Sequence, residues 1–300
     1  MIRPPRHLGI VGNRGKEGVR ALLPPLIRWI RSKGRAVSLE RGLARGIRGV
    51  GTGVSLETLV RRTDAVLVLG GDGTMLGAAR AASRAGVPIL GVNLGGLGFL
   101  TETGQEDLYP ALERLFAGDV TLEPRAMVEA RVRRAGPAGR ARRGSRSTWQ
   151  EVGLNDAVIH PSERSRVIAM DLTIGAKDIG TLVGDGLIVA SPTGSTAYSL
   201  SAGGPIMAPN SGVFVITPIC PHVLTNRSVI VSERSEIEVE ASEPDYPVYL
   251  TVDGREPLRL ETGSAVHIRK TGEPLPLAVL PEMSFFSVVR QKLKWSGSNI

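Results

Sequence analysis

The stretch from Ala65 to Leu76 limits the possible folds of this chain more than any other part of it. Its first five residues, Ala65–Leu69, are all apolar, which is typical of a fully buried strand in a parallel sheet. Three glycines then surround a single carboxylate, Asp72. Apolar residues at helical spacing follow directly: Met75, Ala78, Ala79 and Ala82. The stretch therefore predicts a strand, a glycine-rich turn and a helix in immediate succession.

A turn of this kind is suited to binding an anion. It points backbone N–H groups at whatever lies above the carboxyl end of the sheet, and phosphate is the usual occupant. Asp72 is the unexpected member, because a phosphate site does not favour a negative charge. Two roles remain open for it. Asp72 takes a proton from a hydroxyl group that then attacks a phosphoryl group, or it caps the helix that follows.

Composition places the chain among globular proteins with two domains or one large domain. It has 300 residues, of which 42% are hydrophobic and 22% charged. We expect no membrane contact, because no apolar run is long enough to span a bilayer and the N-terminus lacks a signal-peptide pattern. The single cysteine, Cys220, excludes an internal disulfide framework and fits the cytoplasm. The four histidines show no metal-ligand spacing, so no protein-held metal site is predicted.

The net charge of +8 raises the question of a nucleic-acid partner. Much of the excess charge falls in one arginine-rich stretch, residues 134–148, which has no acidic residue. Aromatic residues for base stacking are few, and no nucleic-acid-binding signature is present. We therefore interpret this stretch as a solvated loop and expect no nucleic-acid partner.

The spacing of apolar residues changes near residue 121. Before that point, predicted strands (7–11, 35–39, 65–69 and 88–92) alternate with predicted helices (19–32, 55–62 and 105–117). This predicts a Rossmann-like, doubly wound parallel α/β domain made of residues 1–122 and 280–300. Residues 123–279 contain many short strand-like runs and predict an all-β domain of sandwich type. A final helix over 284–295 is expected to return to the first domain.

Three further stretches combine polar residues with sharp turns. Residues 93–100 follow the next strand of the parallel sheet and are rich in glycine. Because this stretch leaves the same end of the sheet as the Asp72 turn, we favour a shared site over an ordinary loop. Asn155 and Asp156 open a strand, where neighbouring side chains point to opposite faces. They serve one pocket only at a bulge or strand end; a simple turn at a strand edge is the alternative.

The third stretch, residues 185–201, is the richest in polar groups. A strand-like run ends in a Pro/Gly turn, and several hydroxyl groups and Tyr198 begin a short helix. Helix capping alone does not require so many hydroxyls, so this helix start suits a nucleoside or a phosphate. Residues 252–255, in contrast, predict a tight hairpin turn.

Taken together, these stretches resemble the NAD kinases. The resemblance rests on Gly70–Thr74, Asn93–Leu100, Leu154–Asp156 and Asp185–Pro205, in that order. Residues 220–227 and the terminal stretch 285–295 resemble the family's pattern as well, so the similarity spans about residues 64–295. The run from Asp185 to Pro205 is the most specific of these motifs.

The resemblance implies an activity, its substrates and an assembly. A member of this family transfers the γ-phosphoryl group of ATP, or a phosphoryl group of another donor such as polyphosphate, to the 2′-hydroxyl of the adenosine ribose of NAD. The product is NADP. Mg²⁺ arrives on the nucleotide, since the sequence contains no dedicated metal cage. The family forms homodimers or homotetramers.

The resemblance also implies roles for individual residues. Asp72 matches the general base, and the phosphate-donor loop comprises Gly70, Gly71, Gly73 and Thr74. Asn155 and Asp156 match the pair that holds adenosine. The full set of expected NAD-binding positions is Asp72, Gly73, Phe99, Asn155, Asp156, Arg166, Asp185, Thr193, Thr196, Ala197, Tyr198, Ser199, Leu200, Ser201 and Arg255.

Two other functions share parts of these motifs. A lipid or sugar kinase has a similar glycine turn but no use for the hydroxyl-rich stretch 193–201. A non-catalytic regulator that binds NAD or NADP has use for the pocket but not for a base, so it tolerates Asp72→Asn.

Overall fold

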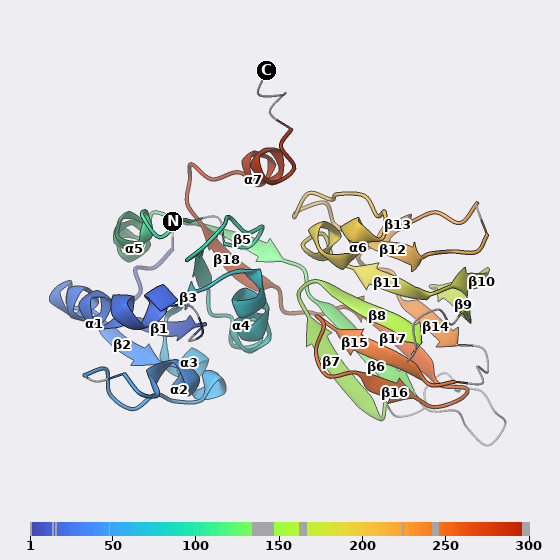
Figure 1. Cartoon of the computed structure of the whole chain (residues 1–300), viewed down its shortest axis with the longest axis horizontal. Helices are drawn as coiled ribbons and strands as arrows, with labels where there is room; N and C mark the ends of the chain where they lie inside the picture. The colour runs from blue at the N-terminus through green and yellow to red at the C-terminus, as the bar shows by residue number, and fades with distance from the viewer. Residues whose placement is uncertain are drawn as a thin grey trace. The chain divides into compact units, whose positions relative to one another are not determined.

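The computed structural model describes residues 2–13, 15, 17–47, 49–101, 103–133, 147–161, 167–223, 225–241 and 246–295. The chain divides into two compact units, unit 1 (Met1–Arg125 and Glu273–Ile300) and unit 2 (Ala126–Gly272) (Figure 1). Most of the arginine-rich stretch predicted as a solvated loop lies outside the described residues. Within the described part of the chain, no helix is both long enough and apolar enough to cross a membrane.

Unit 1 is built on one six-stranded sheet with the order β2–β1–β3–β4–β18–β5. The strands are β1 (His7–Gly12), β2 (Ala36–Leu39), β3 (Ala65–Leu69), β4 (Ile89–Val92), β5 (Thr121–Arg125) and β18 (Leu275–Val279). All neighbours are parallel except β5, which runs antiparallel to β18 at the edge. Strand β18 lies in the stretch expected to belong to the second domain, and it pairs here with β4 and β5.

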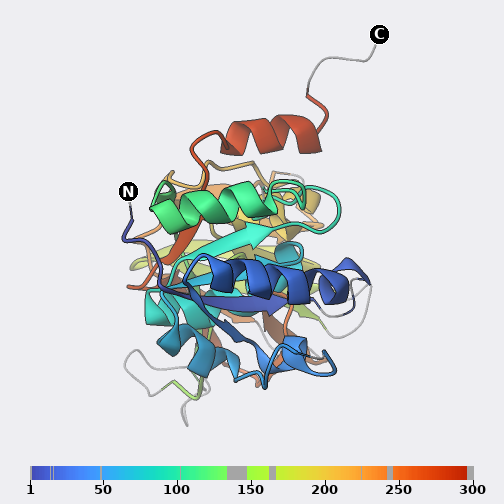
Figure 2. The same cartoon turned by 90° about the vertical axis from the view of Figure 1, so that its left-hand side faces the viewer.

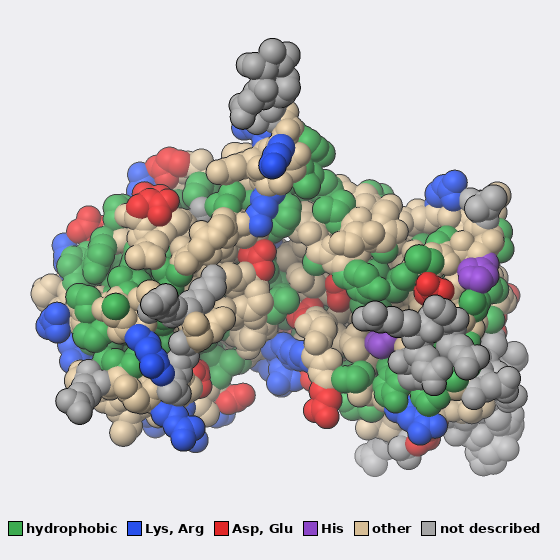
Figure 3. Space-filling view, viewed as in Figure 1, with side chains coloured by type: hydrophobic (Ala, Val, Ile, Leu, Met, Phe, Trp, Pro, Cys, Tyr) green, Lys and Arg blue, Asp and Glu red, His purple; other side chains and the backbone are tan. Residues whose placement is uncertain are grey.

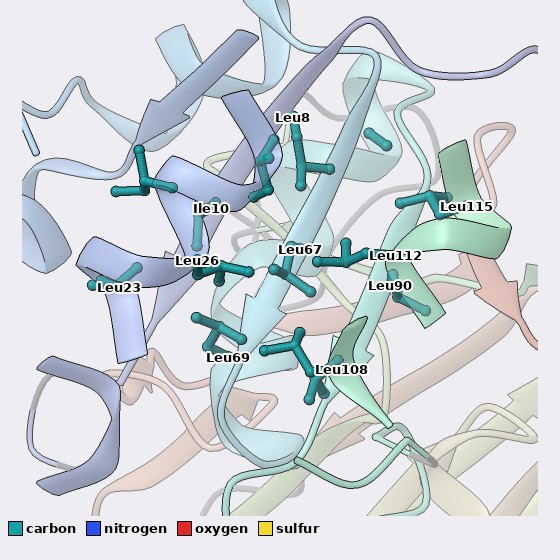
Figure 4. Packing of buried hydrophobic residues seen from close by; sticks show 14 of the residues in the cluster. Leu8, Ile10, Leu23, Leu26, Leu67, Leu69, Leu90, Leu108, Leu112 and Leu115 are labelled. Atoms are coloured by element: carbon teal, nitrogen blue, oxygen red, sulfur yellow. The ribbon is translucent and has the colours of Figure 1, made fainter. Parts of the chain in front are cut away.

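Helices cover both faces of this sheet, as a doubly wound fold requires. The helices of unit 1 are α1 (Glu17–Ser32), α2 (Arg41–Ala44), α3 (Leu56–Arg62), α4 (Asp72–Ala85), α5 (Leu108–Ala117) and α7 (Phe285–Lys292). On one face, α1 and α5 enclose a core of leucines with Leu67 and Leu69 of β3 (Figure 4). Figure 2 shows these two helices in front of the strands. Helix α1 is continuous although it contains Pro24 and Pro25.

The opposite face of the sheet packs against α3 and α4. A side chain at Gly9 would lie 2.7 Å from Leu59 of α3, and one at Gly91 would lie 3.0 Å from the sulfur of Met75 in α4. Alternate residues of a strand point to opposite faces, so these glycines let the two helices lie close to the backbone. The predicted fold class of this unit is confirmed.

Unit 2 consists of two six-stranded antiparallel sheets. One has the order β10–β9–β14–β17–β6–β7, the other β13–β12–β11–β8–β15–β16. The first contains β6 (Val128–Arg133), β7 (Trp149–Gly153), β9 (Ile168–Ile174), β10 (Lys177–Gly184), β14 (Ile237–Ala241) and β17 (Ala265–Lys270). The second contains β8 (Asp156–Pro161), β11 (Gly186–Ala190), β12 (Val213–Ile219), β13 (Val229–Ser232), β15 (Val248–Val252) and β16 (Leu258–Leu260).

Side chains of both sheets share one apolar core, which makes unit 2 a sandwich as predicted. Buried residues of β6 and β9 contribute from one sheet, and buried residues of β8, β11 and β12 from the other. The helical pieces of this unit are short: a 3₁₀ turn, η1 (Gly194–Thr196), and α6 (Tyr198–Ser201). The last helix of the chain, α7, belongs to unit 1, as expected.

Candidate active site

Asp72 is the first residue of α4 and follows the carboxyl end of β3 after two glycines, Gly70 and Gly71. The N-cap of the helix is Gly71 rather than Asp72. The carboxylate of Asp72 accepts the backbone N–H groups of Phe99 (3.0 Å) and Leu100 (3.1 Å). The hydroxyl of Thr101 lies 3.4 Å from the same carboxylate. The capping interpretation is therefore wrong, and the two glycine-rich stretches meet at this one carboxylate.

The glycines around Asp72 have different purposes. A Cβ at Gly98 would lie 2.2 Å from Asp72 Oδ1, so this glycine makes room for the carboxylate itself. A Cβ at Gly70 would lie 2.3 Å from Thr74 Oγ1, so it lets the first turn of α4 close on β3. Gly73, in contrast, is exposed, and a Cβ there would meet no described atom within 4 Å. The accessible side of the turn is therefore the one at Gly73.

Helix α7 reaches the same loop from the far end of the chain. The Lys292 ammonium lies 5.6 Å from the ring centroid of Phe99, within the range of a cation–π contact. Phe99 itself is half-buried. The tail thus contributes a positive charge to the loop that holds Asp72.

In unit 2, the second candidate region starts at a bend between β7 and β8. Leu154 and Asn155 form the bend, and Asp156 is the first residue of β8. Asn155 is half-buried and Asp156 is buried. The pair therefore lies at a strand end, which is the condition for both side chains to serve one pocket.

A residue that sequence reasoning missed holds this bend. Asp253 lies in the hairpin between β15 and β16, and its carboxylate accepts the N–H groups of Leu154 (2.7 Å), Asn155 (2.8 Å) and Asp156 (3.2 Å). The prediction of a tight hairpin is confirmed: Asp253 and Gly254 have φ angles of 51° and 64°. In the sequence, Asp253 is visible only as a carboxylate at a turn position. A hairpin turn explains an Asp there without any distant hydrogen-bond partner, so the sequence did not indicate its contact with residues 154–156.

Burial gives Asp156 unusual electrostatics. It raises the pKa of the Asp156 carboxyl to about 7, and the nearby Asp253 carboxylate adds to the effect. Burial also raises the pKa of Asp253, while its three backbone N–H donors and Arg255 counteract that rise. The negative charge of Asp253 therefore disfavours the ionised form of the neighbouring Asp156 carboxyl.

The hydroxyl-rich stretch packs directly on this bend. The Ser191 hydroxyl donates to the carbonyl of Leu154 (2.6 Å), and its N–H donates to the carbonyl of Asn155 (2.9 Å). A Cβ at Gly194 would lie 2.1 Å from that Asn155 oxygen. Residues 154–156 and 191–194 thus form one continuous region of unit 2.

Not all hydroxyls of this stretch are available to a ligand. Ser195 donates to the carbonyl of Pro192 and accepts the N–H of Met207, and the Ser199 hydroxyl bonds to that of Thr217. Both serine side chains are fully buried. The excess of hydroxyls that suggested a ligand is thus partly consumed by packing. The more open positions are Thr196, Ala197, Tyr198, Leu200 and Ser201, while Thr193 is buried.

The remaining predicted residues are placed as follows. Asp185 is half-buried between β10 and β11, and its N–H donates to the carbonyl of Ile219. Arg255 pairs with Glu151 at 3.2 Å. Arg166 lies outside the described residues. Among the residues that the structure describes, no group of three or more His, Cys, Asp or Glu side chains is arranged to hold a metal ion.

Comparison with known proteins gives a consistent result over nearly the whole chain. Residues 52–120 match the family described as the ATP-NAD kinase N-terminal domain, and residues 154–279 match the ATP-NAD kinase C-terminal domain. The chain is 42% identical over 287 residues to the NAD kinase of Solibacter usitatus, and the match covers 96% of each protein.

Two solved structures share the fold. The yeast NADH kinase complexed with NADH has a TM-score of 0.86 at 23% identity, covering 99% of this chain and 90% of that one. The NAD kinase from Archaeoglobus fulgidus in complex with ATP has a TM-score of 0.73 at 22% identity, covering 96% and 98%. At such identities these structures establish the arrangement of the elements.

Proposed function

The chain belongs to the NAD kinase family, and we propose that it transfers the γ-phosphoryl group of ATP to the 2′-hydroxyl of the adenosine ribose of NAD, giving NADP, with Asp72 as the general base. The observation that carries this proposal is the orientation of Asp72. Two backbone N–H groups from residues 99 and 100 hold its carboxylate toward the loop after β4, away from the N-cap of its own helix. A fixed carboxylate beside an open glycine turn suits proton transfer.

In the proposed reaction, the Asp72 carboxylate takes the proton of the 2′-hydroxyl as that oxygen attacks the γ-phosphorus. The bond between the γ-phosphorus and the bridging oxygen breaks, and ADP leaves. Each carboxylate oxygen of Asp72 has two lone pairs, so the bonds to Phe99 and Leu100 leave acceptor capacity for the hydroxyl. Phosphoryl transfer depends mainly on positioning and charge neutralisation, which fits a site without a covalent nucleophile.

The phosphate donor is proposed to lie at the turn before α4. The backbone of Gly70, Gly71, Gly73 and Thr74 forms this turn, and the first N–H groups of a helix have no partner within the helix. Mg²⁺ would come as part of the nucleotide substrate and screen its charge from Asp72. The ATP complex of the Archaeoglobus relative supports ATP as donor.

NAD is proposed to bind through its adenosine at the bend of unit 2. Asn155 and Asp156 hold adenosine, with Asp156 at the ribose hydroxyls, and Thr193 together with residues 196–201 forms the wall around adenine. Asp185 is proposed to lie near the nicotinamide end, and Gly73 and Phe99 near the ribose. The NADH complex of the yeast relative supports a dinucleotide acceptor.

One assay tests the activity directly. The purified protein is incubated with NAD, ATP and Mg²⁺, and formation of NADP is followed with an NADP-specific dehydrogenase. A parallel reaction with polyphosphate in place of ATP identifies the donor. We expect NADP with at least one donor. Binding of NAD without NADP formation from either donor would overturn the proposal and favour a non-catalytic regulator.

A homodimer or homotetramer is proposed as the working assembly. Strand β13 is the edge of its sheet, and Val229 and Ile230 on it are 42% and 53% exposed. Val223, just before this strand, is 47% exposed. An apolar edge strand of this kind favours pairing with another chain. Light scattering checks the mass, and Ile230→Lys is expected to lower it to that of one chain. A cytoplasmic location is proposed as well, because a chain with a single cysteine has no internal disulfide and fits a reducing compartment.

A further inference from the structure

The contact between Asp253 and the bend is the densest polar contact of the candidate adenosine region. The carboxylate accepts three consecutive backbone N–H groups, from Leu154, Asn155 and Asp156. In return, the N–H of Asp253 donates to the carbonyl of Asp156 at 3.0 Å. Four hydrogen bonds therefore join one hairpin residue to three residues that lie about a hundred positions earlier in the sequence.

The local geometry is built to admit this carboxylate. Asp253 has a φ of 51°, which is uncommon for a residue other than glycine but accessible to Asp. Gly153 faces it: a Cβ there would lie 2.6 Å from Asp253 Oδ1. Any larger residue at position 153 would displace the carboxylate from the three N–H groups.

The bend that Asp253 holds decides where two adjacent side chains point. In a regular strand, the side chains of Asn155 and Asp156 would lie on opposite faces. Here three N–H groups turn toward one carboxylate instead of pairing along a strand, so the ladder is interrupted at Leu154 and Asn155. The bend also supports Ser191, whose hydroxyl and N–H bind the carbonyls of Leu154 and Asn155.

We propose that Asp253 is the positioning residue for the adenosine-binding pair: its carboxylate fixes the bend that directs Asn155 and Asp156 into one pocket. The inference rests on the proposed function and deepens it. Asp253 acts through the other two residues and needs no contact with the substrate.

The charged groups around Asp156 give this positioning role an electrostatic consequence, which adds to the larger effect of burial on the pKa of Asp156. Asp253 faces it from the hairpin, Arg255 lies beside Asp253, and Glu151 of β7 pairs with Arg255. Strand β11 places Ala190 opposite Asp156 and so adds no charge. Removal of the Asp253 charge would therefore lower the pKa of Asp156, because a like charge disfavours ionisation.

The test is Asp253→Asn in the full chain. NAD dissociation constants are measured by calorimetry from pH 5.5 to 8.5, together with the KM for NAD and kcat. In this variant the charge-assisted hydrogen bonds to the bend are lost, and the amide NH2 of the new side chain faces a backbone N–H group where the carboxylate had accepted one. NAD binding should therefore weaken roughly ten- to hundredfold. We expect kcat at saturating NAD to change less than KM, and the pH dependence of binding to move to lower pH.

A matched control is Asp178→Asn. This Asp lies at a bulge of strand β10, accepts a backbone N–H from Gly180 at 2.9 Å, and is exposed. It is expected to leave the KM for NAD and its pH profile unchanged. A second variant, Gly153→Ala, displaces the Asp253 carboxylate without removing its charge. It should raise the dissociation constant for NAD even if Asp253→Asn does not fold.

The outcomes separate this inference from the proposed function. If the unaltered protein forms NADP while Asp253→Asn and Gly153→Ala bind NAD with unchanged affinity and pH profile, the positioning role is wrong and the kinase stands. A variant that loses only thermal stability, with no change in KM or pH profile, also overturns the inference. If the unaltered protein forms no NADP, the proposed function fails whatever the variants do.

Discussion

At the scale of single residues, the proposed chemistry depends on the Asp72 carboxylate, which is held by the backbone of another loop. Asp72→Asn keeps the size of the side chain but removes its basicity. We expect kcat to fall at least about a hundredfold, the range that general-base catalysis contributes, with little change in NAD affinity. Steady-state NADP formation and NAD titration measure the two quantities.

Asp64 offers a matched control for Asp72. Its carboxylate also accepts two backbone N–H groups, from Arg6 (2.7 Å) and His7 (2.9 Å), in the same unit. Asp64→Asn removes a similar set of hydrogen bonds away from the glycine turn. Activity close to that of the unaltered protein is expected. Equal inactivation by both substitutions would mean that Asp72 matters for folding and not for proton transfer.

Asp156 leads to a prediction about pH. Burial, with a further contribution from Asp253, raises its folded-state pKa from 3.8 to about 7. Between these values the folded chain retains a proton that the unfolded chain has lost, so this group's stabilising contribution is complete below about pH 4 and is lost as pH rises to about 7. The loss is at most about 4 kcal/mol. Thermal unfolding between pH 4 and 8 should show a shallower slope for Asp156→Asn. Parallel slopes would contradict the prediction.

At the scale of secondary-structure elements, the loop after β4 is shaped around the start of α4. Gly98→Ala would place a methyl group 2.2 Å from Asp72 Oδ1, so either the loop or the carboxylate must move. Overpacking of this kind typically costs about 1–3 kcal/mol, and we expect kcat to fall by more than tenfold. Gly96→Ala in the same loop has no neighbour within 4 Å and should leave kcat and stability nearly unchanged. Equal rates for both variants would refute this prediction.

The same elements show which features a sequence can reveal. The run Ala65–Leu69 and the helical spacing after it predicted β3 and α4 correctly, because both patterns are local. The partners of Asp72 lie 27 and 28 positions away, and those of Asp253 lie 97 to 99 positions away. Such contacts depend on how distant segments pack, so the pattern around Asp72 left its role open and the hairpin at Asp253 gave no hint of a partner.

At the scale of the whole molecule, the chain returns to unit 1 after completing unit 2. Strand β18 lies between β4 and β5, and its Leu275 and Leu277 are almost completely buried. The stability of unit 1 therefore depends on a strand inserted from the far end of the sequence rather than on its N-terminal residues alone.

The described residues form no large basic patch on the face drawn in Figure 3. The described Lys and Arg side chains there lie scattered among acidic and apolar groups.

Two truncations test this dependence on the returning strand. A chain ending at residue 272 lacks β18, which leaves β4 and β5 without the strand between them and exposes the surrounding apolar side chains. We expect unit 1 of this shortened chain to lose cooperative unfolding, as measured by circular dichroism. We also expect the chain to form no NADP. A chain ending at residue 280 retains β18 and loses only α7, with the Lys292 contact to Phe99 and the Arg114–Glu282 ion pair. Removal of α7 also uncovers the surface that Val288 and Val289 bury, but the chain should still unfold cooperatively, because all six strands of the sheet are present and exposed ion pairs contribute little. If the chain ending at 272 unfolded like the full chain, β18 would be dispensable and the sheet would be held by its N-terminal strands.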